Sequence, residues 1–195
     1  MNGLTIANVT PSFHTSSALA PPDWTLDVDT FWVEERRFEN AALDFDSPQE
    51  PQQNVTALLF VEKRNLSTPQ AARMIATAAG TDAGQVHWAG LKDTHATTRQ
   101  WLSITLPAEE ASASTRLDAL LASLRASLPT PQDDQGLRVL QAVYTQRRLR
   151  VGQLLGNAFR VRLPQTTAAT RLEARIEEVA QQGYPNFFGM QRFGG

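Results

Sequence analysis

Asp93 lies in a short segment of the chain that is rich in cationic side chains. Lys92 precedes it directly, and His95 and Arg99 follow it within the same segment. A carboxylate in a tight turn between two apolar segments, with positive charge nearby, stays ionised at neutral pH and is directed outward. Such a carboxylate suits a nucleophile or a general base. These residue types also make ordinary surface ion pairs, and chemistry alone favours that second interpretation.

A second feature is a run of arginines late in the chain. Five of them fall within a stretch that contains no acidic residue: Arg147, Arg148, Arg150, Arg160 and Arg162. The chain as a whole has a net charge of −2, which argues mildly against a nucleic-acid binder. A local positive field can nevertheless exist within an acidic total. The run therefore fits either a solvated arginine surface or a surface that faces RNA.

The composition is typical of one soluble domain. With 195 residues and 42% hydrophobic content, the chain can bury one sizeable core. It contains no apolar run long enough to cross a bilayer, and its start lacks the pattern of a signal peptide. The lack of cysteine excludes disulfides and thiolate metal sites, and the three histidines lack ligand spacing. We therefore expect a cytoplasmic protein that holds no metal and does not enter a membrane.

Hydrophobic periodicity predicts strands that are interleaved with helices. Strands are predicted over residues 24–35, 55–62, 85–89, 99–106, 137–144 and 158–163. Helices are predicted over residues 68–79, 117–128 and 172–180, with Thr68 as the first N-cap and Gly80, Pro129 and Gly183 at the three ends. Residues 36–54 lose this periodicity, which predicts a long, mobile connection. The order favours an α+β fold with a mixed, largely antiparallel sheet flanked by helices, and Asp93 in a strand-to-strand connection.

The last predicted strand has two unlike faces. Phe159, Val161 and Leu163 share one face, and Arg160 and Arg162 share the other. Such a strand is well suited to a sheet that meets RNA.

Three motifs resemble the tRNA pseudouridine synthase D (TruD) family, and they occur in the same order. They are AGLKDTHATTRQW at 89–101, RLRVG leading to GNAF at 148–159, and PNFFGMQRFG at 185–194. Three motifs with plausible spacing are a far more specific signal than one. The resemblance implies a mixed sheet flanked by helices with an RNA cleft across one face. It also implies conversion of uridine to pseudouridine in tRNA, at uridine 13, without a cofactor.

The resemblance implies roles for particular residues. Asp93 takes the position of the aspartate that attacks the target nucleotide. A stacked uridine must be extruded into a pocket, and Phe159 matches the aromatic residue that would support the base. The alternative for Phe159 is a plain core position. Asn157 would hold the catalytic loop or the uracil edge, or else it tolerates a left-handed backbone beside Gly156.

Other site residues are less fully specified. Phe31 matches the aromatic of an N-terminal family motif, but residues 25–30 lack the basic residue with which that motif opens. Lys92 beside Asp93 is a candidate RNA contact, although the cation that pairs with the aspartate is left open. Arg192 lies in a glycine-rich and aromatic segment that would shape the cleft and contact phosphate. The same segment fits equally well a structural turn in which the aromatic side chains pack against one another.

The resemblance covers only the N-terminal part of a longer family pattern. We expect residues 1–22 to be a flexible leader and residues 23–195 to be the first part of the catalytic domain, without its insertion domain and C-terminal part. Two hypotheses follow. The chain is a tRNA-modifying isomerase, or the leading part of one, or it is a truncated, catalytically inactive remnant that still binds RNA.

Overall fold

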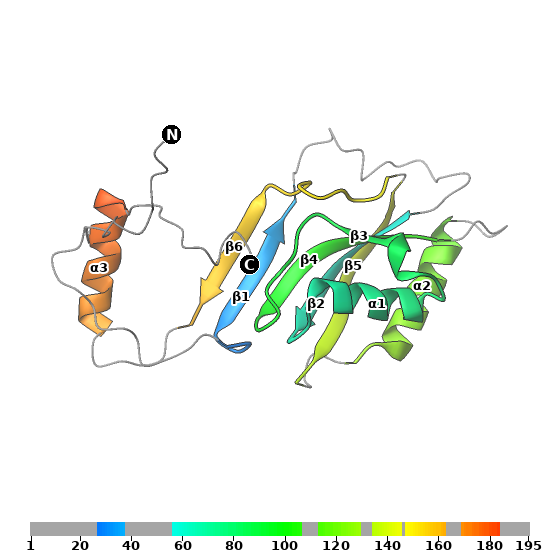
Figure 1. Ribbon diagram of the computed structural model, residues 1–195, viewed down its shortest axis with the longest axis horizontal. Coiled ribbons are helices and arrows are strands. Elements are labelled where there is room, and N and C mark those ends of the chain that lie inside the picture. Colours follow the sequence, from blue (N-terminus) through cyan, green and yellow to red (C-terminus); the bar gives the residue numbers. More distant parts are fainter. Residues whose placement is uncertain are drawn as a thin grey trace, which may run out of the picture. The chain divides into compact units, whose positions relative to one another are not determined.

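The computed structural model describes residues 27–37, 56–106, 113–129, 134–145, 147–162 and 169–183. The chain forms two compact units, one comprising Leu26–Arg162 and the other comprising Met1–Thr25 with Leu163–Gly195 (Figure 1). In the second unit the described element is helix α3 (Ala169–Gln182), which was predicted from its apolar spacing. Gly183 follows it with φ of 75°, a left-handed conformation that suits glycine at a helix end.

The larger unit is built on a six-stranded sheet with strand order β5-β2-β4-β1-β6, while β3 pairs with β4. Its strands are β1 (Phe31–Arg36), β2 (Thr56–Arg64), β3 (Val86–Trp88), β4 (Thr97–Thr105), β5 (Gly136–Thr145) and β6 (Gly156–Val161). The β1–β4 pair is parallel, and the other pairs are antiparallel. This sheet, with its flanking helices, confirms the predicted α+β class.

Helices α1 (Thr68–Ala78) and α2 (Ala113–Ser127) pack on one face of the sheet, which we call the helix face (Figure 1). Alternate residues of each strand point to the same face, so Leu59 and Val61 of β2 and Leu102 of β4 lie together there. Ile75 of α1 and Leu124 of α2 complete this core, and both are almost fully buried. The leucine stripe of the second predicted helix is therefore core.

The opposite face of the sheet has a much smaller apolar cluster. It consists of the buried Leu58, Trp101 and Leu149, with Phe60 and Val143 packed against them. The Trp101 and Phe60 rings stack with centroids 4.8 Å apart. Leu149 belongs to the segment between β5 and β6, so this cluster ties that segment to the sheet.

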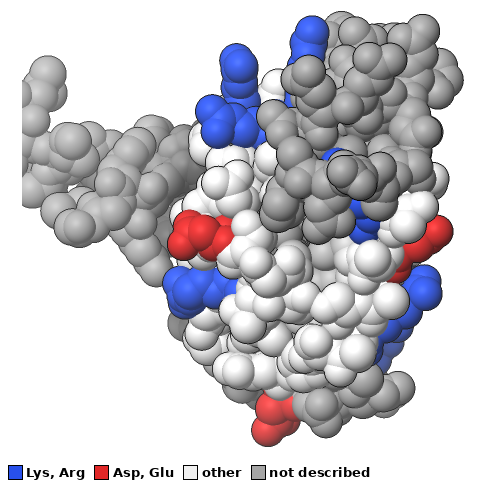
Figure 2. Space-filling model, turned by 90° about the vertical axis from the view of Figure 1, so that its right-hand side faces the viewer, with Lys and Arg blue, Asp and Glu red and all other residues white. Residues whose placement is uncertain are grey.

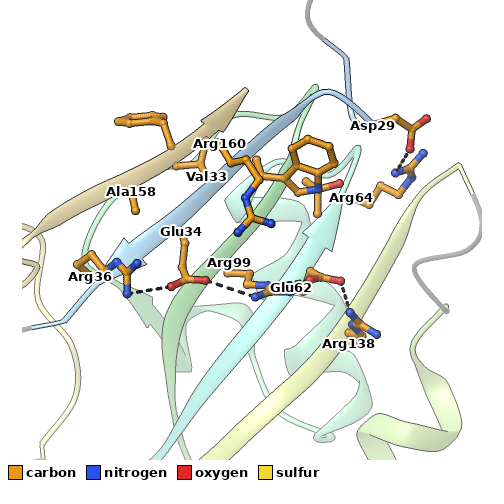
Figure 3. A pocket seen from close by; sticks show the side chains of 13 residues that line it. Asp29, Val33, Glu34, Arg36, Glu62, Arg64, Arg99, Arg138, Ala158 and Arg160 are labelled. Atoms are coloured by element: carbon orange, nitrogen blue, oxygen red, sulfur yellow. Dashed lines mark hydrogen bonds and ion pairs between the residues drawn. The ribbon is translucent and has the colours of Figure 1, made fainter. Parts of the chain in front are cut away.

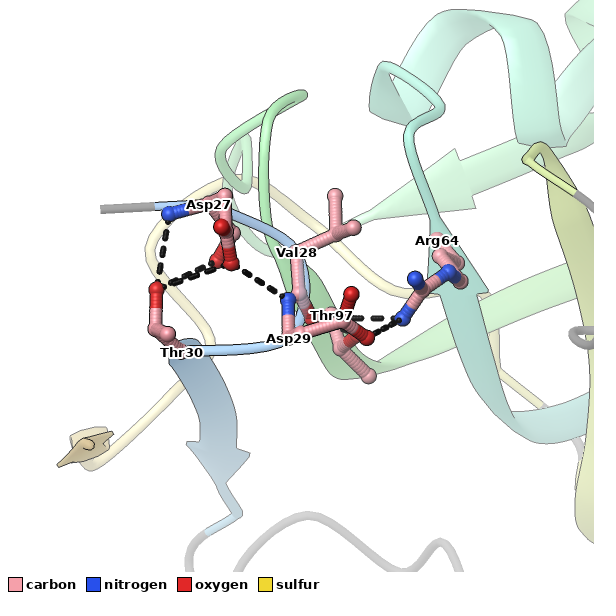
Figure 4. A network of polar contacts seen from close by, with 6 residues as sticks. All are labelled: Asp27, Val28, Asp29, Thr30, Arg64 and Thr97. Carbon is pink, nitrogen blue, oxygen red and sulfur yellow. Dashed lines mark hydrogen bonds and ion pairs between the residues drawn. The ribbon is translucent and has the colours of Figure 1, made fainter. Parts of the chain in front are cut away.

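The first strand begins later than the periodicity predicted. Residues 27–30 form a turn in which the hydroxyl of Thr30 accepts the Asp27 N–H at 2.8 Å and donates to Asp27 Oδ1 at 2.9 Å (Figure 4). These local side-chain bonds compete with strand pairing, so β1 starts only at Phe31. Residues 24–26 and most of the predicted connection 36–54 lie outside the described residues.

The first helix begins with Ser67, and the prediction of Thr68 as its N-cap was wrong. Ser67 has an extended backbone, its hydroxyl accepts the Gln70 N–H, and the Gln70 side chain accepts the Ser67 N–H at 2.8 Å. This reciprocal pair is a capping box. The Thr68 hydroxyl is engaged elsewhere, because it accepts the Lys92 N–H at 3.0 Å and donates to Gln100 at 2.8 Å.

We expect the substitution Ser67→Ala to lower the free energy of unfolding by about 1 kcal/mol, because it leaves an amide at the start of α1 without its acceptor. The substitution Ser67→Gly is the matched control and should cost only a few tenths of a kcal/mol. Urea denaturation followed by circular dichroism measures both. An unchanged midpoint for Ser67→Ala would contradict the cap.

Candidate active site

Lys63 lies at the end of β2, on the helix face and beneath the loop that carries Asp93. Its side chain is fully buried. The Nζ atom donates to the backbone carbonyls of Leu66 at 2.5 Å, Asp93 at 2.7 Å and Lys92 at 3.4 Å. An ammonium group has three protons, so these three carbonyls match its donors. The loop backbone at Asp93 is thereby bound to the sheet.

Lys63 is also the cation whose charge interacts with Asp93. Burial lowers the pKa of Lys63 to about 8, while the negative charge of Asp93 raises that pKa and the positive charge of Lys92 lowers it further. Burial dominates because it disfavours the charged form. Lys63, which lies 30 positions before the aspartate, thus places a buried positive charge beneath the Asp93 loop.

Lys92 is held in a buried ion pair. Its Nζ atom lies 2.7 Å from Oε2 of Glu35, and both side chains are almost fully buried. The other carboxylate oxygen of Glu35 accepts the Trp101 N–H at 3.3 Å. Glu35 is on the helix face because it alternates with Val33, which pairs with Thr98 of that face. Lys92 thus points into the structure and holds the loop, and it does not offer its charge to the surface.

A chain of hydrogen bonds connects the same loop to the start of α1. The Lys92 amide donates to the Thr68 hydroxyl, which donates to Oε1 of Gln100. Nε2 of Gln100 in turn donates to the carbonyl of Gly90 at 3.5 Å. Thr68 and Gln100 are both buried, so these bonds are protected from water. The loop is fixed at Gly90, Lys92 and Asp93, while the side chain of Asp93 is exposed.

The other cationic neighbours of Asp93 in the sequence are His95 and Arg99. His95 is exposed. Arg99 belongs to the opposite face of the sheet, where Nε binds Oε2 of Glu62 at 2.8 Å and Nη1 lies 3.3 Å from Oε2 of Glu34. Sequence proximity therefore does not bring Arg99 to the aspartate, because odd-numbered and even-numbered residues of β4 point to different faces.

Phe31 and Phe159 form an aromatic pair across β1 and β6. Their ring centroids lie 6.2 Å apart and the rings are inclined by 7°. The register pairs Phe159 with Val33, which places both rings on the helix face. Phe159 is 62% exposed, so the alternative of a plain core phenylalanine is wrong. β6 offers a flat, accessible aromatic surface on the same face as the Asp93 loop.

Asn157 lies on that face as well. It pairs in register with Glu35, and its side chain is exposed. Among the described non-glycine residues only Asn65 has a positive φ, so Asn157 does not serve to accommodate a left-handed backbone. No side-chain hydrogen bond to another described residue engages its amide, which can both donate and accept at the surface.

A cavity of about 520 Å³ lies on the opposite face of the sheet, and a row of ion pairs crosses it (Figure 3). From β1 to β5 the row runs Arg36, Glu34, Arg99, Glu62 and Arg138, with contacts of 2.7–3.3 Å. The hydrogen bond that Arg99 donates to Glu62 raises the pKa of Arg99. Each carboxylate in the row has two arginine partners, so the row joins four strands, and its three arginines and two glutamates leave one unit of positive charge.

Other parts of the molecule offer fewer candidates. On the side shown in Figure 2, the coloured basic and acidic side chains are interspersed and form no large basic patch. Within the described ranges, no group of three or more potential metal ligands comes together. Those ranges also contain no helix that is long and apolar enough to span a membrane. Arg192 lies outside the described residues, so the structure says nothing of its predicted role.

Comparisons with known proteins agree on one family. The family model described as tRNA pseudouridine synthase D (TruD) matches residues 26–195. The tRNA pseudouridine synthase D of Stutzerimonas stutzeri is 44% identical over 137 residues, which are 70% of this chain and 35% of that protein. That of Aeromonas salmonicida is 40% identical over 134 residues, 69% of this chain and 34% of that protein. The chain therefore spans about a third of the length of these relatives.

One solved structure supports the same fold. The putative tRNA pseudouridine synthase D of Methanosarcina mazei matches with a TM-score of 0.58 and 25% sequence identity. The match covers 86% of this chain and 34% of that one.

The buried Lys63 predicts a pH dependence of stability. The pKa of Lys63 is about 8 in the folded chain, whereas the ordinary value of 10.5 applies in the unfolded chain. At a pH between these two values the unfolded chain therefore binds more protons than the folded chain. The free energy of unfolding of the parent, relative to Lys63→Met, should therefore rise as pH increases from 8 to 10.5. Urea titrations across this range measure the difference.

A second substitution checks that this rise comes from the titration of Lys63. Lys63→Arg keeps a permanent cation, so the variant should lack the rise relative to Lys63→Met. A parent curve parallel to that of Lys63→Met throughout would contradict the depressed pKa.

Proposed function

The chain belongs to the tRNA pseudouridine synthase D (TruD) family, and on that premise we propose that it forms the N-terminal part of a catalytic domain that isomerises uridine to pseudouridine in tRNA. The observation that carries the proposal is the exposed Asp93 carboxylate on a loop whose backbone is bound from below by Lys63. The resemblance to the family points to uridine 13 as the target. Residues 23–195 would constitute this part of the domain, and a tRNA substrate fits a cytoplasmic location.

In the proposed reaction Asp93 is the nucleophile. Its carboxylate attacks C1′ of the ribose, the bond from C1′ to N1 breaks, and uracil leaves with the electron pair. The base then turns, C5 forms a new bond to C1′ as the carboxylate departs, and the proton lost from C5 is balanced by one gained at N1. Substrate and product are isomers, so the reaction requires no oxidant, reductant or group donor.

The held loop suits this chemistry because a nucleophile must be presented in one orientation. Fixing a reacting group in place removes part of the entropic barrier to attack. The contacts from Lys63, Glu35 and Gln100 hold the loop at Gly90, Lys92 and Asp93. The positive charge of Lys63 lies close to the aspartate without forming a direct side-chain ion pair that would block it.

Phe159 is the proposed support for the extruded base. Its ring is exposed and is held parallel to that of Phe31, which leaves one flat surface available for stacking. Asn157 would contact the hydrogen-bonding edge of uracil, because a side-chain amide can donate and accept at once. These residues share the helix face with the loop, which supports a single site.

The nucleophile is tested with the substitution Asp93→Asn, which keeps the size of the side chain and removes its charge. Pseudouridine formation in a tRNA transcript should fall by more than about 10⁴-fold. Carbodiimide labelling followed by mass spectrometry measures the product. Asp118→Asn, an exposed aspartate of α2, is the control and should leave formation unchanged. Product that persists in Asp93→Asn would rule out this nucleophile, and salt-sensitive tRNA binding without product from the parent would favour an inactive protein.

The base support is tested with the substitution Phe159→Ala. Loss of one base–aromatic stack should lower the single-turnover rate of pseudouridine formation by about 5- to 150-fold. Val161→Ala removes a neighbouring exposed apolar side chain of β6 and should have little effect. Equal rates for Phe159→Ala and the parent would contradict stacking on Phe159.

A further inference from the structure

A groove of about 340 Å³ lies beside β3, apart from the aromatic pair of the candidate active site. Two chain segments line it, Val86–Trp88 and the residues Arg148, Leu149, Arg150 and Val151. We call it the arginine groove. It adjoins the base of the Asp93 loop, because the Gly152 N–H donates to the carbonyl of Ala89 at 2.7 Å.

The wall that carries the arginines is firmly attached to the sheet. Leu149 is 2% exposed and packs in the cluster with Leu58 and Trp101. Its amide donates to the hydroxyl of Ser103 at 2.8 Å. The residues on either side of this anchor, Arg148 and Arg150, are exposed. One buried residue thus holds two arginines at the rim of the groove.

The positive charge of the arginine groove is not neutralised by the described part of the chain. None of the described residues that line the groove is acidic. Within the described ranges, no hydrogen bond or ion pair engages the guanidinium group of Arg148 or Arg150, whereas those of Arg99 and Arg138 are bound by carboxylates. Arginine presents a planar fork of donors that fits phosphate oxygens. The two guanidinium groups are therefore available to bind an anionic ligand.

The pKa of His87 is a second indication of the positive electrostatic potential in this groove. Its pKa is lowered first by burial and then by the positive charge of Arg148. The imidazole is therefore neutral at pH 7, with one ring nitrogen as a donor and the other as an acceptor. It adds a hydrogen-bonding group to the groove without adding a charge.

We propose that the arginine groove binds the phosphodiester backbone of the RNA substrate through Arg148 and Arg150, and so guides the strand toward the Asp93 loop. This inference rests on the proposed function, because it takes tRNA as the partner. A phosphate site of this kind positions the RNA without reading its bases. It accounts for a concentrated positive charge on a chain whose net charge is −2.

The test compares two double variants of the full chain that remove the same charge. One is Arg148→Gln with Arg150→Gln, and the control is Arg73→Gln with Arg125→Gln, two exposed arginines of α1 and α2. Fluorescence anisotropy measures the binding of a tRNA transcript and of oligo(U) over a range of salt concentrations. We expect the groove variant to weaken binding of both RNAs about tenfold or more, and to reduce the slope of log K against log salt by about 1 to 2. The control should keep the slope of the parent.

The outcomes separate this site from the proposed function. If the parent binds tRNA and both double variants bind equally, the groove is not the docking site, although tRNA stays the partner. A loss confined to the tRNA, with oligo(U) unaffected, would overturn a backbone site in favour of contacts that depend on shape or sequence. If the parent shows no salt-sensitive RNA binding, the groove and the tRNA partner are both overturned.

Discussion

The arrangement depends on a buried ammonium group that has to find hydrogen-bond acceptors. A cation removed from water is costly unless its donors are satisfied, and Lys63 is fully buried. The chain satisfies it with three carbonyls, one from the segment before α1 and two from the loop. The end of β2, the start of α1 and the Asp93 loop must therefore come together around one charge. The need of the buried Lys63 ammonium group for acceptors therefore also sets the position of Asp93, the proposed nucleophile.

The two faces of the sheet deal with charge in different ways. On the opposite face, arginines and glutamates alternate across four strands in a row of ion pairs (Figure 3). On the helix face, the pair of Glu35 and Lys92 is buried and leaves the carboxylate of Asp93 exposed beside it. Arg148 and Arg150, which pair with no carboxylate of the described residues, lie beside β3. Ion pairs thus join the strands on the opposite face, whereas the charges proposed to meet the substrate lie on the Asp93 loop and in the arginine groove.

Local signals in the sequence predicted most of the elements, and they failed where a side chain acts beyond its own element. Apolar periodicity placed the strands and the leucine-rich helix because burial of one face sets that period. It started β1 too early, since the bonds of Thr30 within its turn leave no trace in hydrophobicity. The prediction of Thr68 as the cap was also wrong, because the preceding Ser67 is of a residue type that caps a helix equally well. Only the tertiary contacts of Thr68 explain why its hydroxyl is used elsewhere.

The sequence by itself determined the family, the fold class and the identity of Asp93 as the candidate nucleophile, because motif spacing and alternation are local properties of the chain. Only the tertiary structure decided that Lys63 is the cation beneath Asp93, and that Lys92 and Arg99 are bound to glutamates. Lys63 and Asp93 are separated by 30 positions, so their contact arises only when β2 and the loop meet in the fold. Sequence proximity suggested Lys92 and Arg99 as the cations near Asp93. The direction in which each side chain leaves the backbone decides its actual partner, which is a glutamate for both.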